Sequence, residues 1–106
     1  IYDSSSLNVY ASLLSANSGL AHLDLYFQAK SLISDLKTFC AVPKAQKLTL
    51  GQLYPSSTIN ASQICKQSLK ISGSGKLKLR VKLDFHLNGS SSITNEQFDH
   101  KFHETL

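Results

Sequence analysis

The segment that decides the fold of this chain is residues 77–87, Leu77-Lys78-Leu79-Arg80-Val81-Lys82-Leu83-Asp84-Phe85-His86-Leu87. Its odd-numbered positions are all apolar, and its even-numbered positions are all charged or ionisable. Successive side chains on a β-strand point to opposite faces, so this pattern predicts a strand with one face in a core and the other in water. The polar face then carries Lys78, Arg80 and Lys82, about 7 Å apart along the strand.

These three basic residues, here called the cationic shelf, have two possible roles. Like charges in a row repel one another, so the arrangement adds nothing to the stability of the strand. The shelf either keeps the chain soluble as a solvated face, or it offers a binding surface to an acidic partner.

Charge is distributed unevenly along the chain, which has a formal net charge of +4. The span from Leu36 to Leu83 contains no Asp or Glu, yet it holds nine of the eleven basic residues. This asymmetry favours an anionic ligand such as an acidic peptide, nucleic acid or anionic lipid. Only one basic residue is an arginine and there is no Arg/Gly/aromatic run, which argues against nucleic acid.

The length of 106 residues predicts one domain, spanning residues 1–106, with a single core. No apolar run approaches the roughly 20 residues of a membrane-spanning helix. The start Ile1-Tyr2-Asp3 is not a signal peptide and suggests a fragment of a longer protein.

Apolar alternation recurs in other short segments, which predicts further strands near residues 7–13, 21–27, 36–42, 47–53 and 64–71, with a weaker one near 92–98. Turn-forming residues such as Pro43, Pro55 and Asn88-Gly89 separate these segments. Short strands with turns roughly every ten residues indicate a β-sandwich.

The two cysteines, Cys40 and Cys65, are too few for a disulfide scaffold and do not form a Cys-x-x-Cys pair. They could form a single disulfide in a secreted domain. We favour free, buried thiols in a cytosolic protein.

No sequence motif indicates catalysis, a cofactor or a metal site. His100 and His103 have the spacing of one helix face, but no cysteine or second histidine pair accompanies them, so we interpret them as surface histidines. Asp24 and Asp84 have no evident base partner and are interpreted as charges on the wet faces of strands. The chain is therefore predicted to be a binding module that needs no cofactor, not an enzyme.

Three segments, in this order, resemble a known family. The first is Phe39-Cys40-Ala41-Val42-Pro43-Lys44, the second is Leu48-Thr49-Leu50 with Leu53-Tyr54-Pro55-Ser56-Ser57, and the third is the basic strand 77–87 with Asn88-Gly89. Together they are similar to the γ-adaptin ear (GAE) domain of γ-adaptins and GGA adaptors, over roughly residues 1–90. The sequence departs from the family by a longer gap around Gly51-Gln52 and by a divergent tail, residues 97–102.

The resemblance implies an all-β, immunoglobulin-like β-sandwich of about eight strands with no catalytic activity. It implies a peptide-binding appendage that recruits accessory proteins to clathrin coats at the trans-Golgi network and endosomes. The domain would be cytoplasmic and would reach the membrane only through its parent protein. Its ligands would be short peptides built from an acidic residue, a Phe or Trp, a Gly and an apolar residue. Matching residue by residue, the peptide site comprises Ala41, Pro43, Lys44, Leu50, Lys78, Arg80 and Lys82.

Two alternatives come from other functional classes. One is a basic β domain that binds nucleic acid through the same strand, with a steep dependence on salt. The other is a secreted immunoglobulin-like domain with a Cys40–Cys65 disulfide. Within the resembling family, the sequence leaves open whether the parent is a GGA adaptor or the large γ subunit of a heterotetrameric adaptor; the monomeric architecture of GGA adaptors and the divergent tail favour a GGA.

Overall fold

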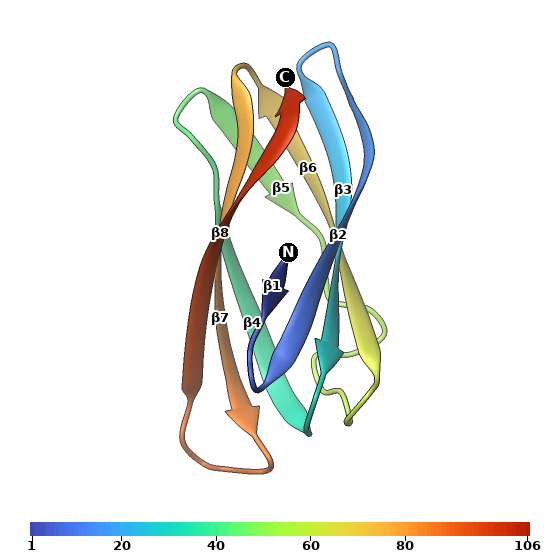
Figure 1. Ribbon diagram of the computed structural model, residues 1–106, viewed down its shortest axis with the longest axis vertical. Helices are drawn as coiled ribbons and strands as arrows, with labels where there is room; N and C mark the ends of the chain where they lie inside the picture. Colours follow the sequence, from blue (N-terminus) through green and yellow to red (C-terminus); the bar gives the residue numbers. More distant parts are fainter.

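The computed structural model describes residues 1–106 as eight β-strands in two sheets (Figure 1). The strands are β1 (Tyr2–Asp3), β2 (Leu7–Asn17), β3 (Leu20–Ala29), β4 (Ile33–Ala41), β5 (Gln46–Leu50), β6 (Ile64–Gly73), β7 (Lys76–Leu87) and β8 (Thr94–Thr105). One sheet has the order β1-β2-β3-β6-β5 and the other β4-β7-β8, and all paired strands are antiparallel. No helix of the chain is long and apolar enough to cross a membrane. The predicted all-β sandwich of about eight strands is confirmed.

The inner faces of the two sheets form one hydrophobic core. The odd-numbered row of β7 contributes five side chains that are at most 2% exposed: Leu77, Leu79, Val81, Leu83 and Phe85. The five-stranded sheet contributes buried side chains that include Leu25 and Phe27 of β3 and Ile71 of β6. The even-numbered cationic shelf is exposed, so the face assignment predicted from the alternation is confirmed.

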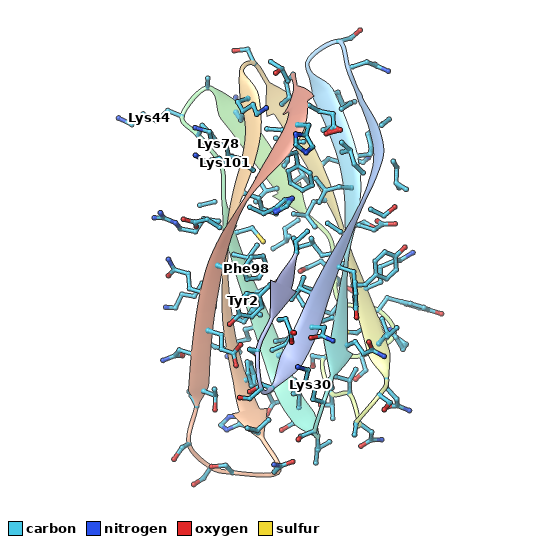
Figure 2. The ribbon with its side chains drawn as sticks, viewed as in Figure 1. Tyr2, Lys30, Lys44, Lys78, Phe98 and Lys101 are labelled. Carbon is cyan, nitrogen blue, oxygen red and sulfur yellow. The ribbon has the colours of Figure 1, made fainter.

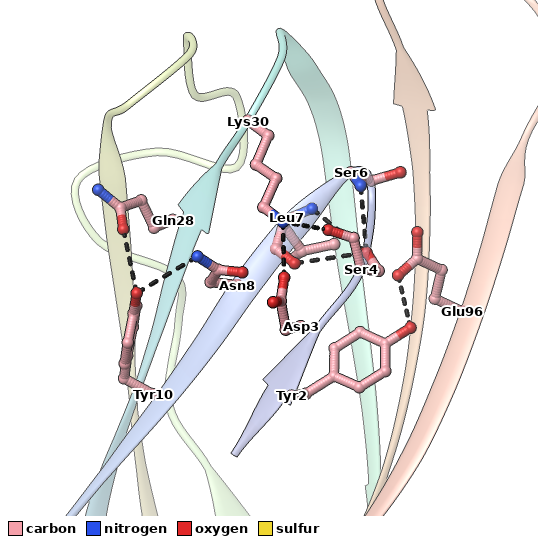
Figure 3. A network of polar contacts seen from close by, with 10 residues as sticks. All are labelled: Tyr2, Asp3, Ser4, Ser6, Leu7, Asn8, Tyr10, Gln28, Lys30 and Glu96. Atoms are coloured by element: carbon pink, nitrogen blue, oxygen red, sulfur yellow. Dashed lines mark hydrogen bonds and ion pairs between the residues drawn. The ribbon is translucent and has the colours of Figure 1, made fainter.

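The short strand β1 connects the two sheets. It pairs with β2 of the five-stranded sheet, whereas the Tyr2 ring stacks on Phe98 of β8, with ring centroids 4.5 Å apart (Figure 2). The Tyr2 hydroxyl donates a 2.7 Å hydrogen bond to Glu96 (Figure 3). Burial, together with the neighbouring Glu96 carboxylate, raises the pKa of Tyr2. These contacts hold β8 against the N-terminal end of the chain.

Strand β8 is longer than the weak strand predicted near residues 92–98. The register with β7 puts Glu96, Phe98 and His100 on its inner face, so polar residues interrupt the apolar row. The His100 ring meets Phe102 edge-on, with centroids 4.6 Å apart. His100 is therefore not the surface histidine that was predicted, and its burial, aided by the N-terminal ammonium and His103, lowers its pKa.

Asp24 also differs from its prediction as a wet-face charge. It lies on the outer face of β3, but β3 is the central strand of the larger sheet and its neighbours leave Asp24 only 7% exposed. Its carboxylate accepts a 2.7 Å hydrogen bond from the Ser68 hydroxyl on β6. Asp84 is on the outer face of β7 as predicted, but it is partly buried.

Both cysteines are free thiols: Cys65 is fully buried and Cys40 is partly buried. Burial raises the pKa of each thiol to about 11, against an ordinary 9.0. The reactive thiolate is then about a hundredfold scarcer than in an ordinary cysteine.

We therefore expect the native protein to react slowly with a thiol reagent at pH 8. Once the protein is unfolded in urea, two thiols per chain should react promptly. A domain with a Cys40–Cys65 disulfide would instead show no reactive thiol in urea without reductant. Rapid labelling of the native protein would contradict the burial of both thiols.

Candidate functional site

The cationic shelf lies on the outer face of the three-stranded sheet, with β4 on one side and β8 on the other. On the β4 side, Ala41 is opposite Arg80 and Phe39 is opposite Lys82. Phe39 is 50% exposed, and the Lys82 ammonium lies 5.8 Å from the centre of its ring. The shelf is thus flanked by two outward-facing residues of β4, the aromatic Phe39 and the small Ala41.

A pocket of about 250 Å³ opens where β4 runs into the loop that leads to β5. This shelf pocket is lined by Ala41, Val42, Pro43, Lys78, Leu79, Arg80, Asp99, His100 and Lys101. Lys101 of β8 is the cross-strand neighbour of Lys78, and both project from the same end of the molecule as Lys44 (Figure 2). The pocket therefore combines apolar surface with three basic side chains and one carboxylate.

The structure brings together four of the seven predicted site residues, since Ala41, Pro43, Lys78 and Arg80 all line the shelf pocket. Lys44 follows Pro43 directly in the loop after β4. Lys82 lies one outward position farther along β7 than Arg80, beside Phe39 and outside the pocket lining.

The seventh predicted residue, Leu50, lies elsewhere. It is on β5 of the five-stranded sheet, opposite Leu69, and it does not line the shelf pocket. The chain crosses from one sheet to the other between Ala41 and Gln46, so closeness in sequence does not put Leu50 on the shelf face.

Arg80 does not stand free on the shelf. Its Nε donates to Asp99 Oδ1 at 2.9 Å and its Nη2 donates to Asp99 Oδ2 at 3.2 Å, which is a two-pronged ion pair. These hydrogen bonds lower the pKa of Asp99 and raise that of Arg80. Both side chains are about 60% exposed, so solvent screens the pair and an incoming carboxylate can compete with Asp99.

The adaptin C-terminal domain family matches residues 1–103. The chain belongs to this family. It is also 99% identical over 106 residues to the AP-1 complex subunit gamma-1 of Saccharomyces cerevisiae, covering all of this chain but 13% of that protein.

Two crystal structures of GAE domains share the fold of this adaptin C-terminal domain. The GAE domain of GGA2p from Saccharomyces cerevisiae superposes with a TM-score of 0.82 and 20% identity, covering 96% of this chain and 94% of that one. The GAE domain of yeast GGA1 gives a TM-score of 0.84 and 17% identity, covering 96% of both chains. The resemblance to GAE domains is thus confirmed, and the near-identity to a gamma-1 subunit favours a γ-adaptin over the GGA parent suggested by the tail.

Sequence reasoning missed three residues of this adaptin domain that face the shelf: Phe39, Asp99 and Lys101. Phe39 was visible only as part of the family motif, with no indication that its ring is exposed. Asp99 and Lys101 are 19 and 23 positions away from their neighbours Arg80 and Lys78, and only the register of β8 against β7 reveals them. A pattern within one strand carries no signal of that register.

Proposed function

We propose that this adaptin C-terminal domain, residues 1–106, is a non-catalytic, peptide-binding appendage of a longer clathrin adaptor subunit. It recruits cytoplasmic accessory proteins with short acidic and aromatic motifs for vesicle traffic at the trans-Golgi network and endosomes. The observation that carries this proposal is the shelf pocket, an apolar hollow bordered by three basic side chains on the outer face of the three-stranded sheet.

The chemistry of the pocket suits a motif of acidic, aromatic, Gly and apolar residues. The exposed Ala41 leaves room for an aromatic ring beside Pro43. The aliphatic stems of Lys78 and Lys101 can form apolar walls while their ammonium groups meet carboxylates of the peptide. A few anchors over a small area support weak, reversible binding, with a Kd on the order of 10–100 μM.

The predicted site residues outside the pocket fit the same proposal. Lys44 adds a further basic group at the end of the shelf, and Lys82 with Phe39 extends the surface along the strands. Leu50 does not line the pocket, so we place it outside the immediate contacts of the motif.

Replacing Ala41 with glutamine tests the proposed pocket. The larger side chain should fill the hollow and exclude the aromatic ring of a synthetic acidic-Phe-Gly-Leu peptide. The Kd of this peptide should rise by at least about tenfold, which corresponds to a loss of only ~1.4 kcal/mol of binding free energy. The melting temperature should stay close to that of the parent because Ala41 is exposed. Isothermal titration calorimetry of the two proteins measures the difference.

Ala61→Gln is the matched control, because Ala61 is exposed in the turn before β6 and outside the shelf pocket. Unchanged peptide affinity in Ala41→Gln would remove the pocket from the site. Tight oligonucleotide binding that falls steeply with salt, together with no peptide selectivity, would support the nucleic-acid alternative instead.

A further inference from the structure

The outer face of the three-stranded sheet carries a second pocket, at the opposite end of β7 from the shelf pocket. It has a volume of about 320 Å³ and is lined by Asp35, Leu36, Lys37, Ser57, Asp84, Phe85, His86 and Ile93. In Figure 1, β7 runs along the long axis of the molecule, from the β6–β7 turn at the top to the β7–β8 loop at the bottom, which contains Ile93. We call this second hollow the acidic pocket because Asp35 and Asp84 both line it.

The carboxylates of the acidic pocket lack the side-chain partners that four of the other five acids of the chain possess. Asp3, Asp24, Glu96 and Asp99 each accept a hydrogen bond or ion pair from another side chain. In contrast, Asp84 Oδ1 is shielded from solvent and has no hydrogen-bond partner. The pocket therefore presents acceptor groups without a matching donor.

Neither basic side chain of the pocket forms an ion pair or a hydrogen bond with these acids. Lys37 is the cross-strand neighbour of Asp84, yet the two ion pairs of the chain, Lys30–Asp3 and Arg80–Asp99, do not include it. The His86 ring is turned to the neighbouring loop, where its Nδ1 lies 2.9 Å from the carbonyl oxygen of Ser90. A donor from outside the chain can fill this role.

The two pockets belong to one continuous surface. Arg80 lines the first, Asp84 lines the second, and Lys82 with the exposed Phe39 lies between them. Asp84 lies four positions after Arg80 along the strand, a distance of about 13 Å. An extended peptide has the same rise per residue as a strand, about 3.3 Å, so roughly four of its residues span the distance between the two pockets.

We propose that one extended peptide occupies both pockets, with its acidic and aromatic motif in the shelf pocket and a Lys or Arg about four residues away in the acidic pocket. The 62% exposed side chain of Ile93 offers apolar surface to the stem of that basic residue. This inference rests on the proposed function, and it adds a charge requirement at the other end of the ligand.

The test uses three peptides of equal length: the acidic-Phe-Gly-Leu motif with alanine flanks, and two versions with one arginine placed four residues before or after the aromatic residue. One arginine peptide should bind about three- to tenfold tighter than the alanine-flanked peptide, the range expected for a partly screened charge-assisted contact. Asp84→Asn should remove this gain and leave the affinity for the alanine-flanked peptide unchanged.

Asp35→Asn provides a second variant that should reduce the same gain. Asp35 has a φ of 52°, a left-handed conformation that asparagine accepts well, so this exchange should fold normally. Glu104→Gln is the matched control, because it removes the same charge from β8 at a residue outside the acidic pocket. The gain should persist in this control.

The outcomes separate the two proposals. If the alanine-flanked peptide does not bind, the proposed function is wrong and this inference falls with it. If that peptide binds but neither arginine improves affinity, or if the gain survives in both asparagine variants, the acidic pocket is not a subsite and the shelf pocket stands alone.

Discussion

Truncating Leu83 to alanine will lower the free energy of unfolding by about 2–4 kcal/mol, the range for removing a buried leucine and leaving a cavity. Leu83 is fully buried on the inner row of β7, between the two sheets. Lys82→Ala, one residue away on the exposed row, will change the same quantity by less than about 0.5 kcal/mol. Urea denaturation of the two variants, followed by the same optical probe, measures both values.

The contrast between these neighbours tests the register of the strand. A shift by one residue would exchange the buried and exposed rows of β7 and thus exchange the two outcomes. If Lys82→Ala is the more destabilising change, the face assignment is wrong, and the shelf pocket loses its basic side chains.

Reversing the charge of Arg80 with Arg80→Glu will reduce affinity for the acidic peptide by more than about tenfold, because the variant sets a carboxylate against the acidic residue of the peptide, and like charges that meet across an interface repel. The substitution also removes the partner of Asp99 and leaves two carboxylates opposite each other across β7 and β8. The fold should persist because both positions are largely exposed. Lys70→Glu, the same charge change on the outer face of the other sheet, is the control.

Asp99→Asn provides the opposite test of the same pair. It removes the carboxylate that competes for the Arg80 guanidinium, so the acidic peptide should bind about two- to fivefold tighter, as expected for an exposed ion pair. Weaker binding in this variant would mean that Asp99 positions Arg80 for the ligand and does not compete with it. Unchanged affinity in Arg80→Glu would remove Arg80 from the site altogether.

The faces of β7 could be predicted most directly from sequence, because its inner row is uniformly apolar. The alternation in β7 determines which of its residues are buried, and the structure agrees at every position from Leu77 to Leu83, while Asp84 is partly buried. In β8, Glu96 and His100 occupy inner positions because Tyr2 and Phe102 accommodate them, and no rule within one strand anticipates such partners. In β2, the irregularity between Leu13 and Ser15 leaves Leu14 62% exposed, which breaks the expected alternation.

The candidate site divides in the same way. The alternation predicts the basic row of β7, and the family resemblance predicts Ala41 and Pro43; each prediction uses a single short stretch of sequence. The ion pair between Asp99 and Arg80 depends on how separate segments of the chain pack together. The same is true of the position of the carboxylates in the acidic pocket. Their roles are properties of register and loop position, which become visible only in three dimensions.

The interleaving of buried and exposed residues along β7 has a consequence for how this domain can change over evolutionary time. The odd positions in this stretch are buried and constrained by folding, whereas the even positions are exposed and, under the proposed function, are selected for ligand choice. Mutations at the even positions can therefore accumulate at little cost in stability, and recognition of new motifs can evolve on an unchanged scaffold. Paralogous domains of this shape should thus differ most on the outer rows of β4, β7 and β8, and least on the rows that face the opposite sheet.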